Sequence, residues 1–181
     1  WANLLNSGAG LFTIEATGVL PEGRITPACL GLWDDRTEAA LADTLHRARK
    51  LAPQVPVCIQ LAHAGRKASS HIPWEGGQLM AKEDGGWETF GPSALPQLPG
   101  EAPPTELDAA GMERVKNAFV EAAQRADRIG LEAIEIHSAH GYLLHEFLSP
   151  IANQRHDTYG GSFENRIRFP LEVFEIGRAH V

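Results

Sequence analysis

Two imidazoles and a phenol follow a predicted strand at close spacing. The apolar run Leu131 to His137 ends in the first imidazole, and His140 and Tyr142 come directly after it. Two imidazole N–H groups can converge on one carbonyl oxygen and stabilise the negative charge that develops there. A phenol, with an unperturbed pKa of about 10, can act as a general acid toward an adjacent carbon. The three side chains therefore indicate chemistry on a conjugated carbonyl, and because no side chain supplies hydride, the site requires a redox cofactor.

Two other interpretations of these histidines stay open. The pair can simply be packed or capping side chains. It can also join His63, which ends another predicted strand, in the zinc site of a barrel metallohydrolase, since neutral imidazole is the commonest metal ligand. Against the metal, His137 and His140 lack helical spacing, and the nearby Gln60 and Tyr142 are poor zinc ligands. We therefore predict no metal site.

Predicted strands and helices alternate along the chain. Short β-branched runs at 10–18, 55–63 and 131–137 have the composition of strands. Amphipathic patterns at 36–52 and 108–129 predict helices between them. Strand, helix, strand, helix, strand argues for parallel strands joined by right-handed crossovers, and so for an α/β fold.

The ends of the two helices can also be predicted. In the first, Asp35 is expected as the N-cap with Glu38 three residues later, and Pro53 as the terminator. In the second, a helix from Asp108 is expected to stop at Gly130.

Polar residues occupy one parity of each predicted strand. Buried parallel strands are usually continuous aliphatic runs, so this alternation points one face of the sheet toward a polar space. The lumen and mouth of a barrel provide such a space, whereas both faces of a doubly wound sheet meet helices. The fold class predicted is therefore a partial (β/α)8 TIM barrel. The polar residues concerned are Thr13, Glu15, Thr17, Cys58, Gln60, Glu135 and His137.

The irregular stretch 64–104 follows the second predicted strand and is rich in Gly, Pro and Trp. Loops of this length are uncommon unless they are functional or disordered. A surface excursion is the alternative, but a position at the strand ends favours a lid or pocket wall.

Composition excludes several classes of protein. The 181 residues suit one domain, and the net charge of −7 with dispersed Lys and Arg argues against nucleic-acid binding. No apolar run approaches the ~18 residues of a membrane span. The two cysteines, Cys29 and Cys58, form no paired motif, which favours a reducing cytoplasm.

The last six residues, 176–181, read IGRAHV. The DNA string ATCGGAAGAGCACACGTC, the start of a common sequencing adapter, encodes this peptide. We expect these residues to be a non-native scar rather than a natural helix end, and residues 1–175 to be a fragment of a single domain.

Four blocks of sequence resemble the Old Yellow Enzyme family, in its bacterial, thermophilic-like branch. They are collinear over nearly all of residues 1–175 and are highly specific together. The resemblance implies an FMN-dependent ene-reductase with a (β/α)8 barrel. The blocks are EATGVLPEGRIT (15–26), QLAHAGRKA (60–68), EIHSAHGYLLHEFLSP (135–150) and NQRHDTYGGSFENRIRF (153–169).

The resemblance implies roles for individual residues. Ala16 matches the position whose backbone contacts FMN, and Gln60 matches the amide that binds the flavin pyrimidine edge. His137 and His140 match the pair that binds the substrate carbonyl, and Tyr142 matches the proton donor. The remaining motif residues are expected to be structural: His63, Arg66, Gly160, Gly161, Ser162 and Arg166.

The implied reaction passes hydride from NAD(P)H through FMN to the activated C=C bond of an α,β-unsaturated carbonyl or nitro compound. Relatives with an iron–sulfur module, such as dienoyl-CoA reductases, share these blocks and stay open, as does a homo-oligomeric parent. Only about three of the eight strands of a barrel are present, and the residues that hold the FMN phosphate would lie outside the chain. We expect the 181 residues alone to bind FMN poorly and to be inactive, so that a non-catalytic fragment is a further alternative.

Overall fold

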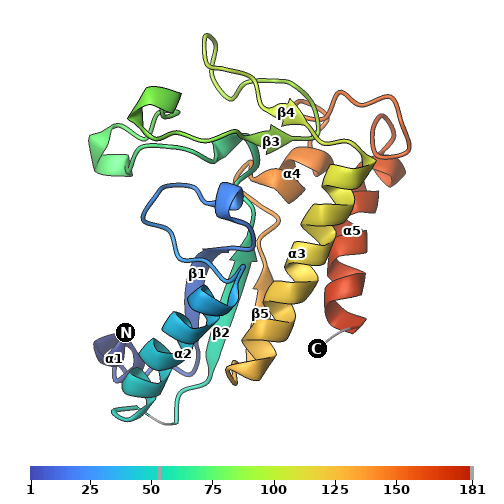
Figure 1. The fold of residues 1–181 in the computed structure, drawn as a ribbon. Coiled ribbons are helices and arrows are strands. Elements are labelled where there is room, and N and C mark those ends of the chain that lie inside the picture. Colours follow the sequence, from blue (N-terminus) through green and yellow to red (C-terminus); the bar gives the residue numbers. More distant parts are fainter. Residues whose placement is uncertain (53, 180–181) are drawn as a thin grey trace.

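The computed structural model describes residues 1–52 and 54–179, with side chains through residue 175. A parallel sheet of three strands forms its centre, in the order β1 (Phe12–Gly18), β2 (Val57–Ala62) and β5 (Ala133–Ile136). Sequence order and spatial order agree, so each crossover joins neighbouring strands (Figure 1). The predicted α/β fold is confirmed.

Two long helices make these crossovers. Helix α2 (Asp35–Arg49) joins β1 to β2, and α3 (Ala109–Arg128) joins β2 to β5. Right-handed crossovers place both helices on one face of the sheet (Figure 1). After β5 come the short α4 (Leu143–Leu148) and then α5 (Phe163–Ala179), which packs against α3 and α4. A short helix, α1 (Ala2–Leu5), precedes β1 and contacts α2.

The hydrophobic core lies between the sheet and these helices. Residues spaced three or four apart on α2 and α3 bury their side chains against the aliphatic residues of β1 and β2, as an amphipathic helix requires. The buried residues of this layer include Ile14, Leu41, Leu45, Val57, Ile59, Leu61, Met112, Val115, Phe119, Ala122 and Ala126.

The start of α2 differs from the prediction. Asp34, not Asp35, is the N-cap: its Oδ1 accepts the Thr37 amide at 2.7 Å, and Thr37 Oγ1 accepts the Asp34 amide at 3.1 Å. The two adjacent aspartates offer the same capping chemistry, and the prediction of Asp35 as the N-cap was wrong. The helix ends at Arg49, and the predicted terminator Pro53 lies outside the described residues. Helix α3 follows its prediction closely, with Asp108 as N-cap and Gly130 at φ +75° just past its end.

A β-bulge in β1 corrects the predicted parity of that strand. The register with β2 shifts between Ile14 and Thr17, so that Thr17 pairs with Leu61. Thr17 therefore lies on the core side and is fully buried, although alternation along the strand predicted it on the polar face. Ala16, inside the bulge, adopts a positive φ of +48°.

The long stretch after β2 carries four short elements and folds back over the carboxyl ends of the strands (Figure 1). Arg155 anchors it by donating to the carbonyls of Pro92 and Leu107, at 3.0 and 2.7 Å. Trp87 adds a bond from its indole N–H to the Glu22 carbonyl at 2.9 Å. The stretch thus lies at the carboxyl ends of the strands (Figure 1), and its role as a lid or pocket wall stays a prediction. The elements are η2 (Gly65–Lys67), η3 (Pro73–Glu75), η4 (Lys82–Asp84) and β3 (Phe90–Gly91), followed by β4 (Thr105–Glu106).

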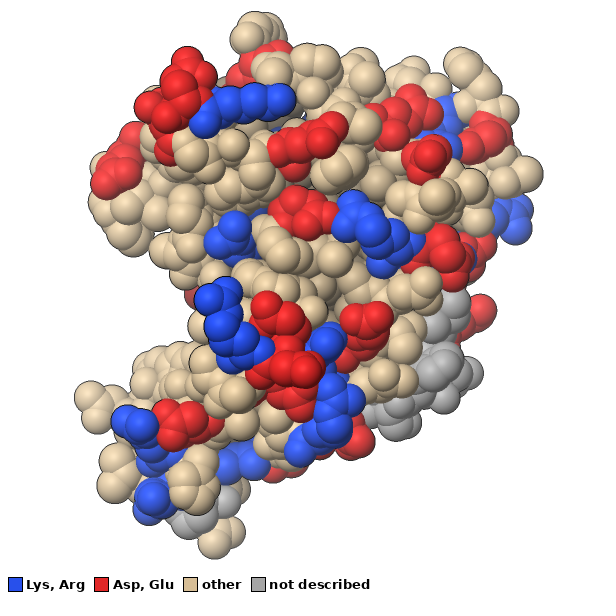
Figure 2. Space-filling model, viewed as in Figure 1, with Lys and Arg blue, Asp and Glu red and all other residues tan. Residues whose placement is uncertain are grey.

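Acidic and basic side chains are mixed over one face of the molecule (Figure 2). Over the face seen in Figure 2, blue and red groups are interspersed rather than gathered by sign. Arg125 and Arg128 of α3, for example, both pair with Glu38 of α2. Among the helices that the structure describes, none combines the length and the apolar character needed to cross a membrane.

Candidate active site

The three residues singled out by their spacing lie together at the carboxyl end of β5. His137 Nε2 and His140 Nδ1 are 3.3 Å apart. The Tyr142 ring lies 4.7 Å from the His137 ring and 6.4 Å from the His140 ring, between ring centroids. The structure therefore brings the predicted pair and the predicted acid into one cluster.

The loop that carries them is tightly constrained. His140 and Gly141 both have positive φ, at +58° and +75°. The Gly141 amide donates to His145 Nδ1 at 2.7 Å, and the Lys67 ammonium donates to the His140 carbonyl at 2.7 Å. Tyr142 is then the N-cap of α4, so the phenol starts from a fixed helix end.

Hydrogen bonding assigns the tautomer of neutral His137. Its Nδ1 accepts the Ala139 amide at 3.3 Å, so the ring proton is on Nε2, facing His140. Burial lowers the pKa of His137, and the neighbouring His140 lowers it further. A neutral imidazole that presents Nε2–H toward its neighbour can donate to an oxygen placed between the two rings.

The phenol of Tyr142 stays protonated at neutral pH. Burial raises the pKa of Tyr142, and the nearby Cys29 and Glu15 raise it further. The hydroxyl therefore keeps its proton at neutral pH and is available as a proton donor.

The two residues predicted to contact a flavin are joined directly. The Ala16 amide donates to Gln60 Oε1 at 3.0 Å, and Gln60 Nε2 donates to Glu135 Oε1 at 2.7 Å. These two bonds fix the orientation of the Gln60 amide. One lone pair on Oε1 and one N–H on Nε2 are left for a ligand with a paired acceptor and donor edge.

Both groups of residues belong to the same region. Gln60 of β2 pairs with Glu135 of β5, and His137 continues that ladder by donating its amide to the Leu61 carbonyl at 2.9 Å. Alternate residues of a strand share a face, so Glu135 and His137 point the same way. Glu135 also acts electrostatically on His137. The Gln60 amide and the His137–His140 pair therefore lie on the same side of the sheet, at the carboxyl ends of the strands.

His63 does not join this cluster. Its ring is fully buried against Gly23, and its Nδ1 accepts the Gly65 amide at 3.1 Å. Burial lowers the pKa of His63 to about 4, so the ring is neutral. Within the described part of the chain, no group of three or more His, Cys, Asp or Glu residues is arranged to hold a metal ion. The zinc alternative thus finds no support in this geometry.

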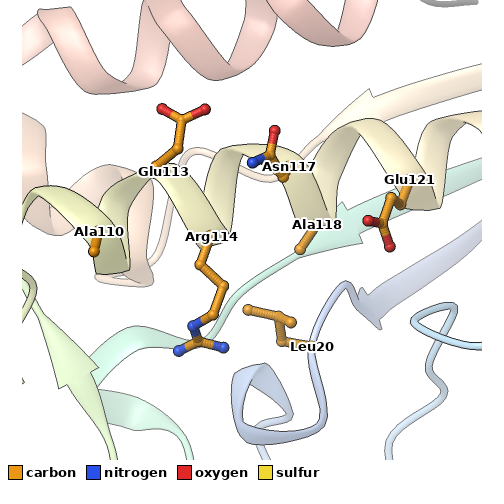
Figure 3. A pocket seen from close by; sticks show the side chains of 7 residues that line it. All are labelled: Leu20, Ala110, Glu113, Arg114, Asn117, Ala118 and Glu121. Atoms are coloured by element: carbon orange, nitrogen blue, oxygen red, sulfur yellow. The ribbon is translucent and has the colours of Figure 1, made fainter.

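A separate groove of about 460 Å³ lies between α3 and the loop after β1. Figure 3 shows Arg114 reaching from α3 past Leu20, while Glu113 and Asn117 point away. Because Arg114 is already paired with Glu22, the groove presents no free converging polar groups comparable to the histidine cluster.

Comparison with known proteins identifies the family. Residues 6–181 match the NADH:flavin oxidoreductase / NADH oxidase family. The chain belongs to this family. An NADH:flavin oxidoreductase of Gibberella zeae is 47% identical over 182 residues, which is 98% of this chain and 44% of that protein. An NADPH dehydrogenase of Geobacillus thermodenitrificans is 43% identical, over 93% of this chain and 45% of that protein.

A solved structure agrees with this NADH:flavin oxidoreductase assignment. The Old Yellow Enzyme of a Pichia species superposes with a TM-score of 0.81 at 29% identity, over 99% of this chain and 46% of that one. The predicted Old Yellow Enzyme resemblance and the partial barrel are confirmed. FMN and a reduced nicotinamide are the cofactors of this family. The chain spans about half the length of the curated relatives that it matches.

The residues present fit a flavin in this oxidoreductase family. A fixed amide at Gln60 suits the alternating donors and acceptors of a pyrimidine edge. The bulge at Ala16 turns the backbone out of the regular ladder beside that amide. Sequence reasoning had named both residues, but it missed Glu135 and Lys67 as site residues. Glu135 was visible only as part of the polar parity, and Lys67 only as a neighbour of Arg66 in the GRK triplet.

Proposed function

We propose that the complete enzyme containing this chain is an FMN-dependent ene-reductase that acts on α,β-unsaturated carbonyl or nitro compounds. FMN, when bound, supplies the hydride that it has received from NAD(P)H. The observation that carries the proposal is the meeting of His137 Nε2 and His140 Nδ1 at 3.3 Å beside the Tyr142 ring. A cluster with this composition can bind an acceptor oxygen and deliver a proton close to it.

His137 and His140 polarise the acceptor oxygen. An oxygen placed between the rings takes the Nε2–H that His137 otherwise directs at His140. His140 contributes a second N–H when its proton is on Nδ1. Donors aimed at the position where charge develops stabilise the enolate-like transition state.

Tyr142 completes the reaction by donating the phenolic proton to the α-carbon of the substrate. Its raised pKa keeps this proton in place until the carbon has become basic. Gln60 serves a different step, because its amide seats the flavin edge and does not touch the reacting carbon. Ala16 fixes Gln60 through its amide and is expected to contact the flavin through its backbone.

The domain boundaries and the cellular setting are part of the proposal. We place residues 1–175 in one FMN-binding barrel domain of a cytoplasmic enzyme that acts on small activated alkenes and not on nucleic acid. A homo-oligomeric parent enzyme belongs to the same proposal. The proposed scar at 176–181 lies entirely outside the described side chains. Resequencing the source DNA beyond Glu175 tests it, and a long native frame through IGRAHV would overturn it.

The function can be tested in a chimaera, in which this chain replaces the matching segment of the Geobacillus thermodenitrificans NADPH dehydrogenase. We expect the purified chimaera to bind FMN and to reduce 2-cyclohexenone with NADPH. Changing Tyr142→Phe should slow reoxidation of the reduced flavin by cyclohexenone by roughly 10²-fold or more, since general acid catalysis contributes on that scale.

Flavin reduction by NADPH should stay unchanged in the same variant, because no proton donor is needed there. Tyr159→Phe provides the matched control, since Tyr159 contacts Glu172 and not the cluster. Stopped-flow measurement of each half-reaction separates the outcomes. Equal slowing of both half-reactions by Tyr142→Phe would contradict the role proposed for Tyr142.

A further inference from the structure

A buried carboxyl lies directly behind the proposed active site. Glu146 of α4 is only 1% exposed, and its Oε1 accepts the backbone N–H of Arg66 at 2.9 Å. Burial raises the pKa of Glu146 to about 8, against the lowering effects of the Arg66 amide and of the Arg66 and Lys67 charges. The carboxyl is therefore mainly protonated at pH 7.

The carboxyl of Glu146 occupies space that is free because two neighbouring residues are glycines without a side chain. A Cβ on Gly65 would lie 2.1 Å from Glu146 Oε1, and one on Gly91 would lie 3.0 Å from Oε2. Gly65 also has a positive φ of +64°. Glu146 thus fills a slot between the turn after β2 and strand β3, rather than reaching a surface.

The turn held by Glu146 touches the catalytic cluster at its other end. Gly65, Arg66 and Lys67 form η2, and the Lys67 ammonium donates to the His140 carbonyl at 2.7 Å. The same ammonium lies 5.8 Å from the centroid of the Tyr142 ring. Any displacement of η2 therefore moves the support of both His140 and Tyr142.

Glu146 is also tied to the cluster through its own helix. Its amide donates to the Tyr142 carbonyl at 2.8 Å, and the Leu143 amide donates to the His63 carbonyl at 3.0 Å. The loops after β2 and β5 are therefore joined at three points. The first is the backbone bond from Leu143 to His63, and the second is the bond from Lys67 to the His140 carbonyl. The third is the bond from the Arg66 amide to the Glu146 carboxyl.

We infer that Glu146 is a positioning residue for the proposed reaction: its carboxyl fixes η2 on α4 and so sets Lys67 against His140 and Tyr142. The inference rests on the proposed function, because it names what holds the imidazole and the phenol in place. The charges that act on Glu146 are Arg66 and Lys67, both on η2, while β3 brings no titratable side chain to the slot.

Substitutions in the chimaera separate positioning from simple stabilisation. Glu146→Gln keeps the acceptor for the Arg66 amide and is expected to retain the rate of flavin reoxidation by cyclohexenone within about threefold. Glu146→Leu removes the acceptor and should slow reoxidation by roughly 10-fold to 100-fold, since small displacements of reacting groups have effects on this scale. Flavin reduction by NADPH should change little in either variant.

A double-mutant cycle tests the route through Lys67. If Glu146 acts by placing Lys67, then Lys67→Met and Glu146→Leu combined should slow reoxidation no more than the more damaging single change. Fully multiplicative effects would overturn the inference, as would equal slowing of both half-reactions by Glu146→Leu.

Hydrogen–deuterium exchange provides a readout that does not depend on turnover. The Arg66 amide and the 140–142 segment should exchange faster in Glu146→Leu and at the unmodified rate in Glu146→Gln. Unchanged exchange in Glu146→Leu would overturn the inference. Failure of the proposed function looks different, because the unmodified chimaera would then lack FMN or enone reduction while these exchange rates still reported on Glu146.

Discussion

At the scale of single residues, neighbours decide what each titratable side chain can do. Tyr142 and His137 both sit in partly buried surroundings, where burial favours the neutral form of each. A neutral imidazole and a protonated phenol are the forms that can donate to a carbonyl oxygen and to a carbon. The residue types could be read from the sequence, whereas the tautomer of His137 required the Ala139 contact.

Gln60 gives a prediction about cofactor binding. Gln60→Leu removes both the acceptor for the Ala16 amide and the donor to Glu135, and it should weaken FMN binding by the chimaera about tenfold, on the scale of one or two hydrogen bonds. Fluorescence titration of the apoprotein with FMN measures the change. Gln97→Leu, at an exposed position, should leave the affinity unaltered. Unweakened binding by Gln60→Leu would remove Gln60 from the flavin site.

His63 gives a prediction about acid stability. Its folded pKa of about 4 lies below the unfolded value of 6.5, so its contribution to stability is complete above pH 6.5 and is lost as the pH falls toward 4. His63→Asn keeps an acceptor for the Gly65 amide but cannot titrate. Between pH 7 and pH 4, the free energy of unfolding should fall by a few kcal/mol more in the unmodified chimaera than in His63→Asn, on the order expected for such a shift. Urea unfolding at several pH values measures this difference. The same pH dependence of the free energy of unfolding in both proteins would contradict the lowered pKa of His63 in the folded state.

At the scale of elements, the periodic helices and strands were predictable and the local departures were not. Apolar spacing located α2, α3 and all three strands of the sheet, because burial of one face leaves a repeating pattern. The bulge at Ala16 leaves no such pattern, since it arises from pairing with β2, and it moved Thr17 into the core. Glu146 is a similar case, because a charged residue is normally assigned to the surface and only packing reveals the slot that holds it.

The cap of α2 can be tested with two adjacent aspartates. Asp34→Ala removes the acceptor for the Thr37 amide and should lower the melting temperature of the chimaera by about 2–4 °C. Asp35→Ala is the matched control, because the Asp35 side chain is 98% exposed and should have little effect. Thermal unfolding followed by circular dichroism compares them. A larger loss for Asp35→Ala would restore the cap predicted from the sequence.

At the scale of the whole molecule, the described sheet lacks neighbours on both sides. Its order is β1-β2-β5, so β1 and β5 each have one edge without a strand partner among the described residues. Phe163, Leu171 and Phe174 of α5 are about half exposed. A closed barrel has no free edges, whereas open edges and exposed apolar side chains promote association between chains.

This arrangement gives a prediction for the 181-residue chain by itself. We expect it to self-associate through the open sheet edges and the exposed apolar side chains. We also expect it to bind FMN poorly, because among the described residues only Ala16 and Gln60 are proposed to contact the flavin. Size-exclusion chromatography with light scattering and the flavin absorbance of the purified protein measure both properties. The chimaera, prepared in the same way, serves as the control. A monomeric 181-residue chain that carries one FMN would contradict this prediction.

The central claim is that His137, His140 and Tyr142 converge on one substrate above a flavin held by Gln60. A crystal structure of the chimaera with FMN and 2-cyclohexenone tests it most directly. We expect the ketone oxygen within hydrogen-bonding distance of both imidazoles, the Tyr142 hydroxyl facing the α-carbon, and the Gln60 amide on the pyrimidine edge. An enone bound elsewhere, or a Tyr142 side chain turned away from it, would contradict the claim.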